Sequence, residues 1–345
     1  MTEVPEVAVV IGAYRRDRFL LSAVRSVLAQ TLPRDRYEVI VTMDFVSPEV
    51  DRFLEEQRIP ILLDNDPRIG TWLLRAVAAT HAPYVAFLDD DDELEPERLS
   101  HALEVLRADP GLGFYRNRVR VIDERGEGVP PNAWRFYATD DYFDHRGPVT
   151  VRPPEKEGLA EFGLIRTRVS FNSSTMIVRR ELLEGEFGAT FARTQLPDLA
   201  LFVLAAVSPF GLYLDDRRLT RYRAYPGKST HRVPWLRHAS EAYRDLASFA
   251  QAHGNVELTQ RLTPVSEHYD RLYRAGTIVD QVGAGAARRE VAHQAEEYLR
   301  FLGRHPAERA VSLDVWAAEM YAAAYLLVPE VARRMSARQS NRRSH

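Results

Sequence analysis

The chain of 345 residues contains no cysteine. Disulfide bonds, catalytic thiolates and zinc sites with thiolate ligands are therefore excluded. The chain also lacks an apolar run as long as the roughly 20 residues that a membrane span needs. Its longest uncharged run lies between Asp198 and Asp215, and Pro209 and Gly211 interrupt it. The opening M-T-E-V-P-E-V has no basic region before an apolar one, unlike a signal peptide. We expect a cytoplasmic protein, with a peripheral position at the inner face of the membrane as the alternative.

Two common nucleotide-binding motifs are absent as well. No G-x-G-x-x-G follows the first apolar segment, which argues against a dinucleotide-binding Rossmann domain. No G-x-x-x-x-G-K-[ST] is present, which argues against a P-loop. The net charge of −3 argues against non-specific nucleic-acid binding. The remaining composition, 45% hydrophobic and 28% charged, is that of a soluble globular protein of one large or two medium domains.

The first part of the chain alternates between apolar, β-prone segments and segments with helical spacing. This order predicts a doubly wound α/β sheet. The predicted strands are 6–14, 37–43, 59–63, 84–88 and 113–123, and the predicted helices are 19–30, 71–80 and 96–108, with a further helix beginning at Ser47-Pro48. Farther along, we expect a loop over 187–193, a helix over 199–207 and a strand over 210–214.

The most distinctive stretch is Y-V-A-F-L-D-D-D-D-E, residues 84–93. A buried strand ends directly in four aspartates, and ligands of open α/β sheets bind at the carboxyl ends of strands. Four adjacent like charges repel one another, and oxygen ligands suit Mg²⁺ or Mn²⁺. The stretch therefore predicts a metal site. The alternative is a solvated acidic loop that supplies an N-cap to the helix near Pro96.

Four further residues are candidates for site chemistry. Asp44, at the end of the second strand, would accept hydrogen bonds from a base N–H or from ribose hydroxyls, or would cap a helix. Arg75 would contact the nucleotide or its phosphate, or form a surface ion pair. Asp198 precedes an apolar helix and would act either as a general base or as a helix cap. His231 would bind the metal or lie in a polar turn.

Residues 124–161 are rich in proline, glycine, aspartate and aromatics and show little periodicity. A stretch of that length without regular structure is more typical of a functional loop than of a simple connection. Its aromatic side chains would stack on sugars or would pin the loop to the body. They are Trp134, Phe136, Tyr137, Tyr142 and Phe143.

From about residue 235 the composition changes, and helical spacing dominates. We expect helices near 235–253, 256–280, 285–303 and 307–335, and a disordered tail over 336–345. An apolar stripe is typical of a core or a dimer seam. It consists of Trp316, Met320, Ala323 and Leu327. The expected domains are 1–234, divided into parts 1–123 and 124–234, and the helical region 235–335.

The first 235 residues or so resemble the family 2 glycosyltransferases, whose nucleotide-sugar-binding GT-A fold has a mixed sheet. V-V-I-G-A-Y-R-R and A-V-R-S-V-L-A-Q-T are similar to the family's V-x-I-P-T-Y-N-R and S-V-L-x-Q-T. The acidic stretch Y-V-A-F-L-D-D-D-D-E-L-E-P-E-R-L is similar to Y-x-x-F-L-D-x-D-D-x-x-x-P-x-x-L and is the most specific of the three signals.

The resemblance implies roles for individual residues. Asp91 would coordinate Mn²⁺ or Mg²⁺ on the diphosphate, with His231 as a late metal contact. Asp198 matches the catalytic base of inverting members. The nucleotide-sugar contacts would be Ala13, Tyr14, Arg15, Asp44, Arg75, Asp89 and Asp90. The acceptor side would include Trp134, Asn172 and Ser173.

The chain departs from the family pattern at several motif positions. Gly12-Ala13 replace Pro-Thr, Met43 replaces the first acid of D-D-G-S, Ala76 replaces the asparagine of R-N, and Pro197 replaces the glutamate of E-D. The resemblance nevertheless implies an inverting, metal-dependent glycosyltransferase with a UDP-linked donor. The acceptor would be a hydroxyl or amine of a glycan, of a lipid-linked sugar or of a small natural product, carrier-bound ones included.

Two alternatives to that function stay open. One is a nucleotidyltransferase that releases pyrophosphate. The other is a catalytically degenerate nucleotide-sugar-binding or scaffold protein, which the replaced motif residues favour. No nucleic acid is expected as a partner, and the C-terminal helices would serve as a homodimer seam or as an acceptor-docking surface.

Overall fold

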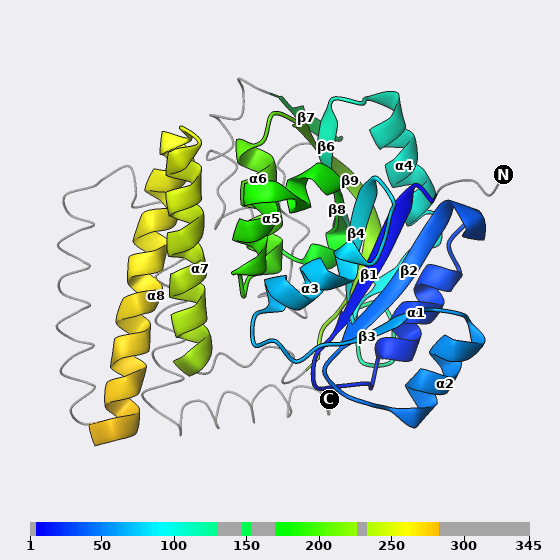
Figure 1. Cartoon of the computed structure of the whole chain (residues 1–345), viewed down its shortest axis with the longest axis horizontal. Coiled ribbons are helices and arrows are strands. Elements are labelled where there is room, and N and C mark those ends of the chain that lie inside the picture. The colour runs from blue at the N-terminus through cyan, green and yellow to red at the C-terminus, as the bar shows by residue number, and fades with distance from the viewer. Residues whose placement is uncertain (1–4, 130–146, 153–169, 226–232, 283–345) are drawn as a thin grey trace. The chain divides into compact units, whose positions relative to one another are not determined.

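The computed structural model describes residues 5–129, 147–152, 170–225 and 233–282 (Figure 1). The chain divides into two compact units. One comprises Met1–Lys228 with Asp245–Thr259, and the other comprises Ser229–Arg244 with Gln260–His345. The domain boundaries expected from the sequence, at residues 234 and 335, stay predictions.

One mixed sheet organises the first unit. Its strand order is β3-β2-β1-β4-β8-β6-β9-β5, and β7 pairs with β9. The pairs β1–β2, β1–β4, β2–β3 and β6–β9 are parallel, whereas β4–β8, β6–β8, β5–β9 and β7–β9 are antiparallel. The strands are β1 Val7–Ala13, β2 Tyr37–Met43, β3 Ile61–Leu63, β4 Tyr84–Asp89, β5 Glu93–Leu94, β6 Leu112–Ile122, β7 Val149–Val151, β8 Met176–Arg179 and β9 Gly211–Arg223. The predicted mixed α/β sheet is confirmed.

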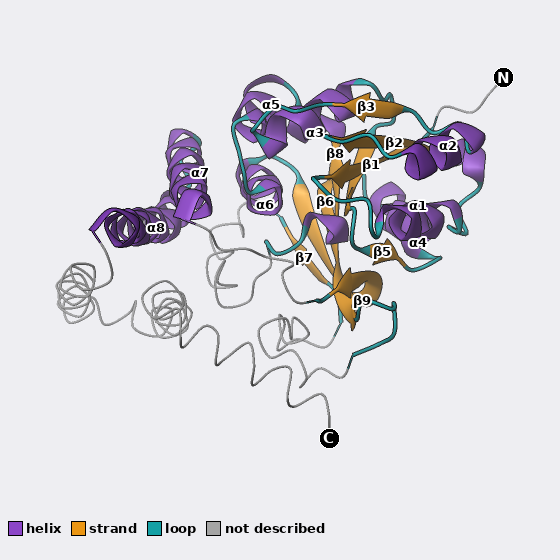
Figure 2. Ribbon diagram, turned by 90° about the horizontal axis from the view of Figure 1, so that it is seen from below, coloured by secondary structure: helices purple, strands orange, loops and turns teal. Residues whose placement is uncertain are grey.

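Helices cover both faces of this sheet (Figures 1 and 2). Those on one face are α1 Leu20–Leu28, α2 Pro48–Glu56 and α4 Arg98–Ala108, and those on the other are α3 Ile69–Ala78, α5 Gly185–Ala192 and α6 Pro197–Val207. Successive side chains of a strand point to opposite faces. Val9 and Ile11 of β1 therefore share a core with Leu20 of α1, while Phe87 of β4 meets Phe191 of α5 with ring centroids 5.8 Å apart.

The structure corrects the sequence prediction over 187–193, where we expected a loop. Helix α5, Gly185–Ala192, covers most of it. Its sequence G-E-F-G-A-T-F-A contains two glycines and a threonine, which are poor helix formers. Phe191 is nevertheless fully buried. Packing of that ring therefore stabilises a helix that local propensity does not favour.

Two strands also differ from their predicted extent. β9 runs from Gly211 to Arg223, well past the predicted 210–214, because it pairs with β6 along most of its length and with β5 near its end. Within the stretch 124–161, where we expected no regular structure, Val149–Val151 forms β7 on the other side of β9. Residues 130–146 and 153–161 of that stretch lie outside the described residues.

The predicted helices near 235–253 and 256–280 are confirmed as α7 Val233–Ala252 and α8 Val256–Val282. In the second unit, the buried hydroxyls of Ser240 and Ser266 each donate to the other residue's carbonyl oxygen, at 3.0 and 2.9 Å. The helices expected at 285–303 and 307–335, the apolar stripe and the tail lie outside the described residues. Within the four described ranges, no helix combines the length and the apolar character of a membrane span.

Candidate active site

The acidic run lies where three parallel strands end side by side. In the sheet register, Gly12 of β1 lies opposite Asp89 of β4, and Ala13 lies opposite Met43 of β2. The residues that follow β1 and β2, among them Tyr14, Arg15 and Asp44, therefore share one sheet edge with the aspartates.

The four aspartates are mostly buried, unlike those of a solvated loop. Asp90 is 2% exposed, and Asp91 and Asp92 are fully buried. Asp89 is partly exposed. The N-cap position of α4 is Glu97 and not one of these acids. The alternative of a solvated acidic loop that caps the helix is therefore wrong.

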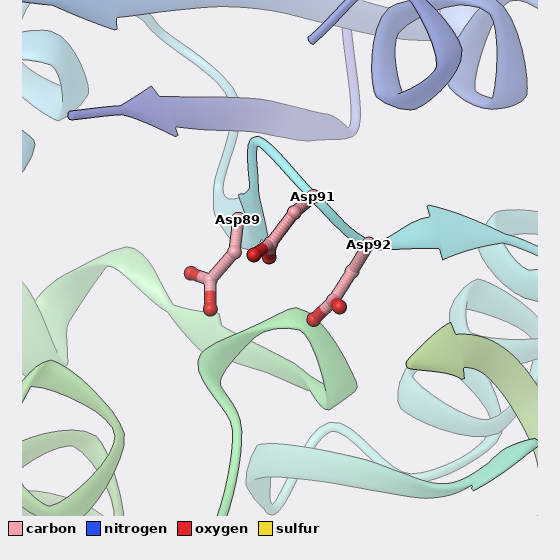
Figure 3. A group of neighbouring side chains, drawn as sticks. All are labelled: Asp89, Asp91 and Asp92. Atoms are coloured by element: carbon pink, nitrogen blue, oxygen red, sulfur yellow. The ribbon is translucent and has the colours of Figure 1, made fainter. Parts of the chain in front are cut away.

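Three of the acids form a group that fits a divalent cation. Asp89, Asp91 and Asp92 each offer a carboxylate oxygen, and these oxygens lie within 4.8 Å of one another. Figure 3 shows the three side chains projecting to the same side of the segment between β4 and β5. Carboxylate oxygens are the ligands that Mg²⁺ and Mn²⁺ prefer, so the chemistry of this donor set fits either ion.

An arginine from the loop after β1 holds two of the acids. Arg16 donates from Nε and Nη2 to the two carboxylate oxygens of Asp90, at 2.7 and 2.8 Å. The same Nη2 lies 2.8 Å from Oδ2 of Asp91, which also accepts the hydroxyl of Tyr225 at 2.8 Å. Burial alone would lower the pKa of Arg16, but the hydrogen bond to Asp90 and the charges of Asp91 and Asp90 raise that pKa above its ordinary value.

A turn before β8 joins the acids to one another. The hydroxyl of Ser173 donates to Asp89 at 2.9 Å, and the side chains of Asn172 and Ser174 donate to Oδ2 of Asp92 at 2.7 and 2.9 Å. The Ser174 hydroxyl in turn accepts the backbone N–H of Asp89 at 3.0 Å. The other oxygen of Asp92 accepts the backbone N–H of Arg223 on β9. Asp92 therefore fixes the turn and β9 around the acidic segment.

The predicted base lies against the same turn. Asp198 is partly exposed in the first turn of α6, whose N-cap position is Leu196. Its Oδ2 accepts the backbone N–H of Asn172 at 3.2 Å, and its Oδ1 accepts that of Leu199 at 2.9 Å. Burial raises the pKa of Asp198 above its ordinary value, although these two bonds and the charge of Arg116 act in the opposite direction. A raised pKa suits a group that must accept a proton.

The structure places the other predicted site residues, most of them expected contacts of the nucleotide sugar, as follows. Asp44 accepts the backbone N–H of Arg15 at 2.7 Å, and the Arg15 guanidinium lies 4.8 Å from the centre of the Tyr14 ring. Arg75 is half-exposed and forms an ion pair with Asp64 at 2.7 Å. Arg75 therefore forms the surface ion pair that was expected as the alternative to a nucleotide contact. Trp134 and His231 lie outside the described residues.

Sequence reasoning missed two side chains of the site. Arg16 aligns with the arginine that ends the family's V-x-I-P-T-Y-N-R, but the sequence analysis gave a role only to its neighbour Arg15, and its pairing with Asp90, 74 residues away, comes from the fold. Tyr225 contacts Asp91 across 134 residues. Its ring packs against Phe19 with centroids 5.2 Å apart, which fixes the hydroxyl near the acid. Only the folded sheet edge brings these side chains together.

Comparison with known proteins supports the resemblance seen in the motifs. The sequence model described as Glycosyl transferase family 2 matches residues 8–184, just over half of the chain. The chain belongs to this family. One similar curated protein, the chondroitin synthase of Escherichia coli, is 29% identical over 146 residues. These residues are 41% of this chain and 21% of that protein. The matched segments span 21% to 38% of the curated relatives.

Two solved structures share the fold of the present chain. S. aureus TarS in complex with UDP has a TM-score of 0.52 at 16% identity, covering 74% of this chain and 70% of its own. The mannosyltransferase PcManGT from Pyrobaculum calidifontis, in complex with GDP-Man and Mn²⁺, has a TM-score of 0.52 at 15% identity, covering 95% and 89%. At such identities the similarity shows the GT-A fold alone.

Proposed function

We propose that this chain is an inverting, metal-dependent glycosyltransferase. It moves a sugar from a nucleotide-diphosphate sugar, with UDP as the expected nucleotide, to a hydroxyl or amine of an acceptor. The observation that carries the proposal is the turn at Asn172 and Ser173. These two consecutive residues donate hydrogen bonds to Asp89 and Asp92 of the acidic run and to the carboxylate of Asp198.

The base chemistry follows from the position of Asp198. Its carboxylate takes the proton of the acceptor O–H or N–H as the acceptor atom forms its bond to the anomeric carbon. The bond from that carbon to the diphosphate oxygen breaks on the opposite side, and the nucleoside diphosphate leaves with the electron pair. The backbone bonds from Asn172 and Leu199 orient the carboxylate, because they occupy one lone pair on each of its oxygens.

Asp89 and Asp91 would hold the cation, and Asp92 would hold the turn that faces it. When bound, a divalent cation neutralises the charge that develops on the departing diphosphate. Asp89 suits this role because it is partly exposed at the sheet edge while Ser173 orients one of its oxygens. Asp92 uses both oxygens to accept hydrogen bonds from the turn and from β9.

The donor would bind across the ends of β1, β2 and β4. Asp44 would face the base or the ribose. The bound ligands of the solved relatives, UDP in TarS and GDP-Man in PcManGT, support a nucleotide-sugar donor and make a test of both bases necessary. The acceptor would be a glycan, a lipid-linked sugar or a small molecule, and a homodimer through the C-terminal helices is the expected assembly.

The test begins with calorimetric titration of UDP, GDP, TDP and CDP, with and without Mn²⁺. We expect metal-dependent binding of one diphosphate. Asp198→Asn should retain that binding and lose sugar transfer, whereas Asp91→Ala should lose the metal dependence. The absence of any nucleotide binding by folded protein would favour the scaffold alternative.

The released co-product separates the proposal from its enzymatic rival. A nucleoside diphosphate fits glycosyl transfer, whereas pyrophosphate would identify a nucleotidyltransferase. Transfer that persists in Asp198→Asn would show that another group is the base.

A further inference from the structure

We propose that Arg16 sets the affinity of the acidic site for its divalent cation. Its guanidinium pairs with Asp90 and Asp91, so a cation at the acids would either displace it from Asp91 or bind beside its positive charge. The inference rests on the metal-dependent function proposed above, and it concerns a residue of the matched V-V-I-G-A-Y-R-R segment to which the resemblance gave no role.

The geometry divides the contacts of Arg16 into a strong and a weak part. Nε and Nη2 make two parallel bonds to Asp90, at 2.7 and 2.8 Å, which is the planar two-point pairing that favours arginine. Nη2, which one of those bonds already uses, also lies 2.8 Å from Asp91. The pair with Asp91 is therefore the part that gives way first, and the pair with Asp90 keeps the guanidinium at the sheet edge.

The contact with Asp91 competes directly with coordination of a cation. Nη2 of Arg16 lies 2.8 Å from Oδ2 of Asp91 as an ion pair, and the same oxygen accepts the hydroxyl of Tyr225 at 2.8 Å. Coordination of a cation through Oδ2 would therefore compete with these two contacts. Coordination through the other oxygen, Oδ1, would place the cation and the Arg16 guanidinium, both positively charged, on the one carboxylate of Asp91. Because a guanidinium does not lose its proton in proteins, this repulsion persists at every pH at which the acids are ionised.

Burial makes the competition strong. The side chain of Asp91 is fully buried and that of Asp90 is 3% exposed, whereas that of Arg16 is 36% exposed. Charges within a buried site are screened little by solvent and salt. Arg16 therefore stays partly open to solvent at the sheet edge across which the donor is proposed to bind. A nucleoside diphosphate would supply negative charge that offsets Arg16, so the cation should bind weakly alone and tightly with the nucleotide.

The chain offers a matched control on the same loop. Arg18 is also an arginine at this edge, but its side chain is 60% exposed and pairs with Glu124 at 3.0 Å rather than with the aspartates. Loss of its charge should leave the acidic site unchanged.

The experiment is a titration of Mn²⁺, with free Mn²⁺ followed by electron paramagnetic resonance, on the full chain without and with saturating UDP or GDP. Without nucleotide, we expect Arg16→Gln to bind Mn²⁺ at least tenfold more tightly than the wild type. Arg16→Lys, which cannot span both carboxylates, should bind several-fold more tightly. Arg18→Gln should stay within twofold of the wild type. With nucleotide, the advantage of Arg16→Gln should shrink.

The outcomes separate this inference from the proposed function. If the wild type binds Mn²⁺ with nucleotide, but neither Arg16 variant binds Mn²⁺ alone more tightly, Arg16 does not compete with the cation. If Arg16→Gln does not fold, the lysine variant decides in the same way. If no variant binds Mn²⁺ even with nucleotide, the metal-dependent function fails and not merely the role of Arg16.

Discussion

Replacement of Asn172 tests whether one side chain holds the active-site turn together. Asn172 has a φ of 68°, in the left-handed region that asparagine and glycine tolerate better than other residues. Its side-chain Nδ2 donates to the buried Asp92 at 2.7 Å, and its side-chain Oδ1 accepts the backbone N–H of Ser174 at 2.6 Å. Backbone conformation and two hydrogen bonds therefore depend on this one residue.

The magnitudes follow from those three features. A hydrogen bond to a charged group contributes about 1.5–3 kcal/mol, and a neutral one about 1 kcal/mol. Asn172→Gly keeps the left-handed backbone and loses both bonds, so we expect it to lose about 3 kcal/mol of the free energy of unfolding. Asn172→Ala adds the cost of a Cβ atom in this conformation, about 1 kcal/mol, for a loss of about 4 kcal/mol.

Urea unfolding followed by circular dichroism measures the loss, read as a shift of the midpoint at an unchanged denaturant slope. Asn255 is the matched control. Its Oδ1 accepts the backbone N–H of Leu258 at the start of α8, and loss of such a cap costs about 1 kcal/mol. If Asn172→Ala shifted the midpoint no more than Asn255→Ala does, the turn would not depend on its side chain. If the glycine and alanine variants were equal, the left-handed backbone would carry no cost.

Three further predictions test other parts of the structure. Arg58 has a φ of 54° just after α2, where glycine is favoured, so Arg58→Gly should stabilise the protein by about 0.5–1 kcal/mol in the same unfolding assay; a loss of stability would contradict this. Gly70→Ala should destabilise by about 3 kcal/mol or more, because its Cβ would lie 1.8 Å from the carbonyl oxygen of Phe191; a neutral result would show that α3 and α5 separate easily. Because burial raises the pKa of Asp198 above its ordinary 3.8, transfer activity should fall as the pH drops through that raised value.

The sheet was predictable where the signal is local. The segment 37–43 coincides with β2 because an apolar, β-branched run lies between a proline-bounded turn and the polar residues near Asp44. Helix α5 was not predictable, because burial of Phe191 against Phe87 stabilises it and that contact spans more than a hundred residues of sequence. The length of β9 was likewise set by its partner strands and not by its own arginine-rich sequence.

Two residues that depart from the family's motifs are buried in the structure. Met43 stands where the family has an acid, and in the structure it is 1% exposed and packs in the main core. Ala76, in place of the asparagine beside Arg75, is fully buried in α3. These positions contribute to packing here. On the proposed function, the polar contacts with the nucleotide would fall to residues such as Asp44, which is partly exposed, and Arg15, which is exposed.

The acidic run shows why identical neighbouring residues take different roles. β4 ends at Asp89 and β5 begins at Glu93, and the acids of this run have different partners. Asp90 pairs with Arg16, Asp92 accepts hydrogen bonds from the turn at Asn172, and Glu93 pairs with Arg221 and Arg223. The arginines offset the charges of Asp90 and Glu93, and the turn supplies hydrogen-bond donors to Asp92. The run therefore tolerates five consecutive acids because the fold supplies counter-charges and donors from three separate segments, which are the loop after β1, the turn before β8, and β9. On the proposed metal-dependent function, the affinity for a cation would therefore depend on Arg16 and on the turn as much as on the aspartates themselves.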